Sequence, residues 1–169
     1  MHHALVYTGS MTPTTPWLSE QEQQLWRSWL ALGSALPAVL HRELQADAGL
    51  SLPDFDVLVQ LTESDGGRLR VSELARSLGW ERSRLSHHVA RMERRELVTR
   101  EDCVDDGRGA FVVLAPAGRA AIEQAAPHHV RTVRRVFLDP LDEHDVAELS
   151  RLVSRLLERV TGEPVSPTA

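Results

Sequence analysis

The most constraining feature of the sequence is the stretch 68–114, where two short helical patterns are followed directly by two extended runs. The first helical pattern stops at Gly79 and the second begins only a few residues later, so a tight turn must join the two helices. The extended runs, 97–100 and 110–114, flank the polar, Asp-rich loop 102–109, which is the pattern of a hairpin. Apolar residues at helical spacing define the inward faces, namely Val71, Leu74, Ala75 and Leu78 in the first helix and Leu85, Val89 and Met92 in the second. Together these elements predict a winged helix-turn-helix.

Helical patterns also lie on both sides of this stretch. Before it, Ser19 and Glu22 form a capping box that starts one helix, in which Pro37 predicts a kink or break. A second helix begins near Ser51, and its predicted apolar stripe consists of Phe55, Leu58, Val59 and Thr62. After the hairpin, we expect a helix from Pro116 that breaks at Pro127, followed by a last helix capped by Asp142. The stripe of that last helix consists of Val146, Leu149, Val153, Leu156 and Val160.

Composition is that of a globular chain, with 42% hydrophobic and 25% charged residues. No apolar run approaches membrane-spanning length and the start does not resemble a secretory signal, so we expect a cytoplasmic protein with no membrane contact. The single cysteine, Cys103, fits a reducing compartment. Glycine-rich phosphate loops, nucleophile elbows and paired catalytic motifs are absent from the sequence, so we predict no catalytic residues, no cofactor and no enzyme activity.

Basic charge is concentrated in the predicted winged helix, although the net charge of the chain is -5. All 19 basic residues are arginines, and residues 1–67 carry two of them against eight acidic residues. Within 82–100 the balance is six arginines against two acids. A local excess of arginine on one element is the electrostatic pattern of a nucleic-acid-binding surface.

The second helix of the predicted pair has an outward face suited to reading base edges. Arg84, His87 or His88, and Arg91 recur at helical spacing on that face. Ser83, Ser86 and Ala90 are small side chains, which allow the helix to enter the major groove. Arginine can bind guanine O6 and N7, and histidine or serine can bond a base edge in the major groove. Ser83 and the free N–H groups of the first turn can also bind a phosphate.

The tip of the predicted hairpin offers a second contact. Arg108 lies between Gly107 and Gly109, where the backbone can turn sharply and the arginine can extend into a narrow minor groove. Asp106 would hold that guanidinium in position without touching DNA itself.

The sequence resembles the MarR family of bacterial regulators. The resemblance rests on the runs 71–79, 83–98 and 105–108 and on Leu114-Ala115-Pro116-Ala117-Gly118-Arg119, and it extends over residues 20–160. It implies a mostly α (α+β) fold, a winged helix-turn-helix core with N- and C-terminal dimerisation helices. The expected regions are a disordered lead at 1–17, a dimerisation helix at 18–50, the DNA-binding lobe at 51–115, dimerisation helices at 116–161 and a tail at 162–169.

The resemblance also implies a function. A homodimer would bind a pseudo-palindromic operator in double-stranded DNA, with one recognition helix in the major groove and one wing arginine in the minor groove of each half-site. In this sequence these are the helix around Arg84, Ser86, His87 and Arg91, and the wing residue Arg108. The usual outcome is repression of the regulator's own or neighbouring genes, relieved by a small ligand that is often an aromatic acid or phenol.

Three aromatic residues are candidates for an effector pocket. Trp26 and Trp29 on the first helix, with Phe55 on the second, would suit an aromatic ligand. The competing interpretation makes them core or dimer-interface residues.

Other functions fit parts of the sequence. Cys103 lies near Arg100 and Arg108, which would lower its pKa and favour oxidation, but it sits in the wing and not near the first helix, where the family's sensing cysteine lies. A metal sensor would need ligands, and the candidates are His41, His128, His129 and His144, whose spacing is not that of a metal site. A winged helix that binds protein and not DNA is the remaining alternative.

Overall fold

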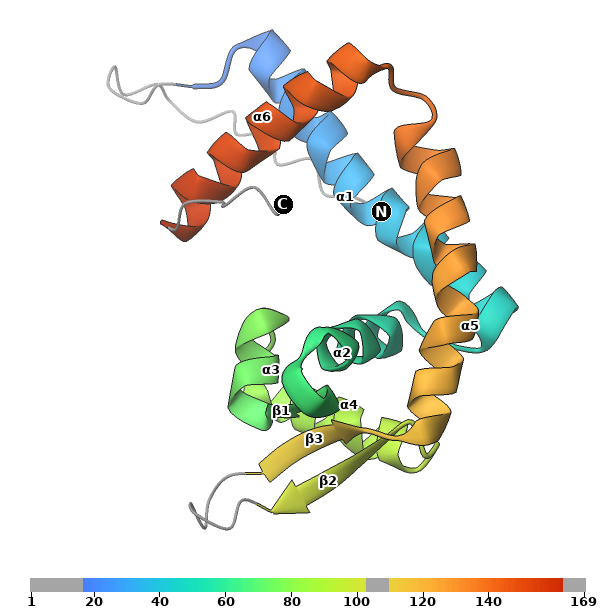
Figure 1. Ribbon diagram of the computed structural model, residues 1–169. Coiled ribbons are helices and arrows are strands. Elements are labelled where there is room, and N and C mark those ends of the chain that lie inside the picture. Colours follow the sequence, from blue (N-terminus) through green and yellow to red (C-terminus); the bar gives the residue numbers. More distant parts are fainter. Residues whose placement is uncertain (1–16, 103–109, 163–169) are drawn as a thin grey trace, which may run out of the picture. The chain divides into compact units, whose positions relative to one another are not determined.

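The computed structural model describes residues 17–102 and 110–162, and the chain divides into two compact units between Ala35 and Leu36. In chain order the elements are α1 (Glu20–Ala48), α2 (Leu52–Glu63), the 3-10 turn η1 (Asp65–Gly67), β1 (Arg68–Arg70), α3 (Val71–Ser77), α4 (Arg82–Glu93), β2 (Val98–Asp102), β3 (Ala110–Leu114), α5 (Pro116–Val133), the π-helical turn η2 (Arg134–Leu138) and α6 (Glu143–Thr161) (Figure 1). The predicted mostly helical class with a small sheet is confirmed.

The sheet has three antiparallel strands in the order β1-β3-β2. The predicted hairpin is confirmed, with Val98 opposite Leu114 and Asp102 opposite Ala110. The strand β1 was not predicted, because three residues are too few to show an alternating pattern. It pairs Arg68 with Val113 on the free edge of β3, and it leads directly into α3. Because β1 leads into α3 and β2 follows α4, both ends of the helix-turn-helix are joined to the same sheet.

One hydrophobic core holds α2, α3, α4 and the sheet together. Its fully buried side chains come from all of these elements, and they include Val57, Leu58, Leu61, Leu74, Leu85, Val89, Met92, Val98 and Val112. The predicted stripe of α2 was wrong at Thr62, which is exposed and donates its hydroxyl to the Leu58 carbonyl. Val57 and Leu61 take the buried positions because α2 is covered on two sides, by α3 and by α5 with β3.

Local capping signals are confirmed at three helices. Ser19 and Glu22, Ser51 and Asp54, and Asp142 and Asp145 each exchange side-chain and backbone hydrogen bonds across the first turn. Each box supplies acceptors for N–H groups that have no partner within the helix.

The break predicted at Pro127 was wrong, and Pro37, where the sequence predicted a kink or a break, does not break its helix. Both prolines lie inside continuous helices, α1 and α5. A proline removes one N–H donor and frees the carbonyl four residues before it. Here those carbonyls belong to Gly33 and Glu123, which are exposed in this chain, as are the two prolines. Water can therefore replace the lost hydrogen bond, and the helix continues.

None of the helices in the described parts of the chain is long and apolar enough to cross a membrane.

Candidate nucleic-acid interface

The helix α4 separates an apolar face from a polar one. Leu85, Val89 and Met92 are buried in the core as predicted, and His88 is buried beside them. The opposite side exposes Ser83, Arg84, His87 and Arg91, and Ser86 is half-buried. The sequence left His87 and His88 as alternatives for the outward face, and the structure places His87 outside. Five of the six residues predicted to contact DNA thus lie on α4, and four of these five are exposed.

The turn before α4 sets its direction. Gly79 has a φ of +62°, a left-handed conformation that glycine adopts without strain. The Trp80 N–H then donates to the Ala75 carbonyl, and the Gly79 N–H to the Arg76 carbonyl. These bonds close the end of α3 within one turn. The short connection fixes α4 across α3, with Leu74 of α3 fully buried between the helices and the sheet.

The Arg84 side chain is supported by an aromatic ring. Its guanidinium carbon lies 4.4 Å from the centroid of the Trp80 ring, a cation–π contact. Trp80 is itself held edge-on against the His88 ring, with centroids 5.4 Å apart. A guanidinium stacked by its face keeps its N–H edge free to donate. Arg84 is therefore presented in a form suited to a bidentate contact with a base.

The buried Asp54 carboxylate on α2 holds the C-terminal half of α4 in place. The Asp54 carboxylate lies 3.0 Å from His88 Nε2 and 2.8 Å from Arg95 Nη1. The second Arg95 nitrogen donates to the Gly49 carbonyl at 2.9 Å, and His88 Nδ1 lies 2.8 Å from Arg91 Nη2. Burial alone would raise the pKa of Asp54, but its contacts with His88, the Ser51 backbone and Arg95 outweigh burial and hold that pKa well below its usual range. Sequence reasoning missed this cluster because its members come from three separate segments.

The hairpin is joined to α4 at its base. Arg100 on β2 donates to the Ser86 carbonyl at 2.6 Å and lies 3.8 Å from the Glu93 carboxylate. At the opposite edge of the sheet, the guanidinium carbon of Arg68 on β1 lies 3.9 Å from the centroid of the Phe111 ring. The wing therefore follows the orientation of α4. The predicted wing residues Asp106 and Arg108, and also Cys103, lie outside the described residues.

The residues predicted for an effector pocket are not alike in burial. Trp26 and Trp29 are 54% and 49% exposed in this chain, whereas Phe55 is 7% exposed and belongs to the core. The Phe55 ring contacts the His129 ring, with centroids 4.3 Å apart. Burial raises the free energy of charging an imidazole and lowers the pKa of His129. Phe55 therefore packs in the core. That Trp26, Trp29 and Phe55 contact a ligand stays a prediction.

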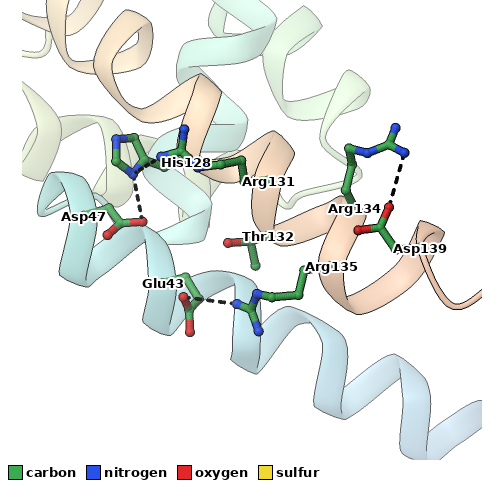
Figure 2. A pocket seen from close by; sticks show the side chains of 8 residues that line it. All are labelled: Glu43, Asp47, His128, Arg131, Thr132, Arg134, Arg135 and Asp139. Carbon is green, nitrogen blue, oxygen red and sulfur yellow. Dashed lines mark hydrogen bonds and ion pairs between the residues drawn. The ribbon is translucent and has the colours of Figure 1, made fainter.

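A charged groove that sequence reasoning did not find lies between the last turns of α1 and the segment α5–η2. Its volume is about 510 Å³, and Figure 2 shows its walls. Asp47 and Glu43 of α1 lie 3.3 Å from His128 and Arg135, respectively. Arg131 also contacts His128, and Arg134 pairs with Asp139. The basic side chains of this groove therefore contact an acidic residue or one another, and the pairs Asp47–His128 and Glu43–Arg135 join α1 to the α5–η2 segment.

The histidines considered for a metal site have other partners. His41 Nδ1 accepts the Leu52 N–H at 3.2 Å, His128 pairs with Asp47, and His129 packs on Phe55. Within the described ranges, no three His, Cys, Asp or Glu side chains are arranged to hold a metal ion.

A helix-turn-helix followed by a hairpin and packed on one core defines a winged helix protein. The family model for the MarR family matches residues 48–109. AbsC, a MarR family transcriptional regulator from Streptomyces coelicolor, is 42% identical with a TM-score of 0.82, over 88% of this chain and 100% of that one. Sco3205, another MarR family regulator from the same organism, was solved in complex with DNA. It is 38% identical with a TM-score of 0.82, over 92% of this chain and 96% of that one.

A probable transcriptional regulator from Pseudomonas aeruginosa is 26% identical with a TM-score of 0.69, over 80% of this chain and 98% of its own. The resemblance seen in the sequence is confirmed by these matches. The chain belongs to the MarR family of transcriptional regulators.

Proposed function

We propose that two copies of this chain bind a pseudo-palindromic operator in double-stranded DNA, each with α4 in the major groove. The observation that carries this proposal is the outward face of α4, where Ser83, Arg84, His87 and Arg91 are exposed on a helix whose other side is locked into the core. A rigid helix with arginines on one face can present their N–H groups to base edges without any rearrangement of its backbone. The similarity to Sco3205, which was solved with DNA, supports the same assignment.

Within this interface we assign separate roles. Arg84, His87 and Arg91 would read base edges, with Ser86 at the edge of the same surface, and Ser83 would contact a phosphate from the first turn. Arg108 at the wing tip would enter the minor groove with Asp106 holding its guanidinium. The link from Arg100 to the Ser86 carbonyl supports a wing that approaches DNA together with α4.

Fluorescence anisotropy with the DNA upstream of the protein's own gene tests this function. We expect a sequence-preferring complex whose association constant falls steeply with salt, because bound arginines release counterions from the phosphates. A shuffled duplex of the same length and composition is the control. Equal, salt-insensitive affinities for both duplexes would contradict DNA reading and favour a winged helix that binds protein.

Replacing Arg84 by alanine should relax base preference within each half-site. If its guanidinium binds a guanine, discrimination at that base pair should fall by about 1–3 kcal/mol. The measurement is the affinity of wild type and variant for operators changed one base pair at a time. Arg42→Ala is the matched control, because it removes an exposed arginine from α1, outside the winged helix. An unchanged base profile in the Arg84 variant would exclude that contact.

The homodimer in this proposal is supported by apolar side chains that the single chain leaves exposed. In α6, no residue is buried, and Val146, Leu152, Leu156, Leu157 and Val160 are all exposed. In the first unit, Leu25, Trp26, Trp29 and Leu30 of α1 are exposed as well. An apolar stripe at helical spacing without a partner marks an interface, and a second copy would cover it. The two recognition helices of such a dimer would be about 34–36 Å apart, one turn of DNA.

We infer that the dimer represses its own or neighbouring genes and is released by a small aromatic ligand. The exposed indoles of Trp26 and Trp29 support an aromatic site, and the same two side chains are suited to the dimer interface. A ligand bound near the dimer helices would act by changing the spacing of the two α4 helices.

A further inference from the structure

The Asp54 carboxylate has three partners, and they divide between its two oxygens. Oδ2 accepts the Ser51 N–H at 2.9 Å and the Arg95 guanidinium at 2.8 Å. Oδ1 lies 3.0 Å from His88 Nε2. The side chains of Asp54 and His88 are only 4% and 8% exposed, so water cannot replace these partners freely. The lowered pKa of Asp54 keeps the carboxylate ionised, and it can therefore only accept hydrogen bonds.

The other nitrogen of His88 faces the DNA-reading side of α4. His88 Nδ1 lies 2.8 Å from Arg91 Nη2. A guanidinium has donors only, so Nδ1 must accept, and the imidazole proton must be on Nε2. In that tautomer the Nε2 proton lies beside the ionised Asp54 Oδ1, 3.0 Å from Nε2, and the contact is electrostatic and not a regular hydrogen bond. The guanidinium beside Nδ1 and the carboxylate beside Nε2 thus favour the same neutral tautomer.

We propose that Asp54 is a positioning residue for DNA recognition, because its carboxylate selects the His88 tautomer whose free Nδ1 holds the Arg91 guanidinium. The inference rests on the proposed function, in which Arg91 contacts DNA. It adds a buried residue, Asp54, that positions Arg91 without contacting DNA. Arg91 is exposed and long, and without an acceptor its guanidinium would sample many rotamers before binding. The hydrogen bond to His88 restricts it in the free protein.

The substitution Asp54→Asn has a defined consequence for this chain of contacts. Two donors, the Ser51 N–H and Arg95, converge on Oδ2, so the amide oxygen of asparagine must occupy that position. The amide NH2 group then takes the place of Oδ1 and faces His88 Nε2. Nε2 becomes an acceptor, the proton moves to Nδ1, and Nδ1–H points at the Arg91 guanidinium. Two donors cannot bond each other, so Arg91 is released.

The tautomer can be measured without DNA. Two-bond ¹H–¹⁵N correlation spectra of the imidazoles, with His88 assigned by its absence in His88→Gln, report which nitrogen carries the proton. We expect the Nε2–H form in the wild type and the Nδ1–H form in Asp54→Asn. Glu63→Gln is the control, because it removes a carboxylate charge from the exposed end of α2, and it should retain the Nε2–H form. An Nε2–H tautomer in Asp54→Asn would overturn the proposal.

A double-mutant cycle on operator affinity tests the link to Arg91. We expect Arg91→Ala to weaken binding about tenfold, as for loss of a charge-assisted hydrogen bond. Asp54→Asn should weaken it several-fold alone and have no further effect in the Arg91→Ala background. Additive losses would mean that Asp54 acts only through the stability of the fold. An Arg91→Ala variant with wild-type affinity would also overturn the proposal, and it would locate the failure in the assignment of Arg91 to the DNA face.

If Asp54→Asn fails to fold, a pair of variants at His88 gives the same test. Glutamine can donate from its amide nitrogen to Asp54 and accept from Arg91 through its oxygen, whereas methionine of similar length can do neither. We expect His88→Gln to keep most of the operator affinity and His88→Met to lose as much as Arg91→Ala. Equal affinities of the two His88 variants would contradict the proposal.

Discussion

Replacing Leu156 by glutamate is expected to convert the protein into a monomer and to lower its affinity for the operator at least about a hundredfold. Leu156 is 55% exposed on α6, so the new charge leaves the core of the chain intact. In a dimer it would be placed in an apolar interface, where an unpaired carboxylate is strongly unfavourable. Binding of the two half-sites is then no longer linked, and the gain from bivalency, typically 10² or more, is lost.

Light scattering at a fixed protein concentration measures the molecular mass, and anisotropy measures the affinity for full and half operators. Ser150→Glu is the matched control, since it adds the same charge to α6 at an exposed polar position. A Leu156→Glu protein that stays dimeric and binds like the wild type would show that α6 is not part of the interface. Circular dichroism of both variants separates dissociation from unfolding.

Replacing Gly118 by alanine is expected to destabilise the fold, by about 2 kcal/mol or more. A Cβ at this position would overlap the Leu97 carbonyl oxygen and would lie 3.1 Å from Leu114 Cδ1. That carbonyl also accepts the Ala115 N–H at the start of α5, so it cannot move away without breaking a bond. Helix propensity acts in the opposite direction and favours alanine by up to about 1 kcal/mol. The overlap with backbone outweighs it.

Urea denaturation at constant protein concentration measures this effect as a shift in the midpoint. Gly33→Ala in α1 is the matched control, because a Cβ there meets no atom within 4 Å. We expect that variant to be as stable as the wild type or slightly more stable. A stabilised Gly118→Ala protein would show that α5 can move away from Leu97, and that the glycine of the Leu114–Arg119 motif is not required for close packing.

Local features of the site were predictable from the sequence. The amphipathic pattern of α4 identified Leu85, Val89 and Met92 as its inward face, because the helical period alone decides which side chains share a side. Ser51 and Asp142 were also predictable as caps, because the backbone N–H groups that they bind lie only three residues away. The hairpin strands were predicted to within two residues.

Contacts between distant segments were not predictable. Asp54 and Arg95 are 41 residues apart, and no pattern in either segment indicates the other. The strand β1 forms only because the edge of β3 is free to pair with Arg68–Arg70. Whether Pro127 breaks a helix depended on whether solvent reaches the freed carbonyl, which is a property of the folded chain.

By itself, then, the sequence determined that 68–114 forms a winged helix with an arginine-bearing helix and an arginine-bearing loop, because periodicity, caps and turns act over a few residues. The tertiary structure decided which of the two adjacent histidines faces outward and how the outward arginines are held. Packing of α4 on α3 and β2 turns His88 into the core, where the buried Asp54 carboxylate of α2 must find donors. That requirement brings Asp54, His88 and Arg91 into one chain of contacts, which only the folded protein contains.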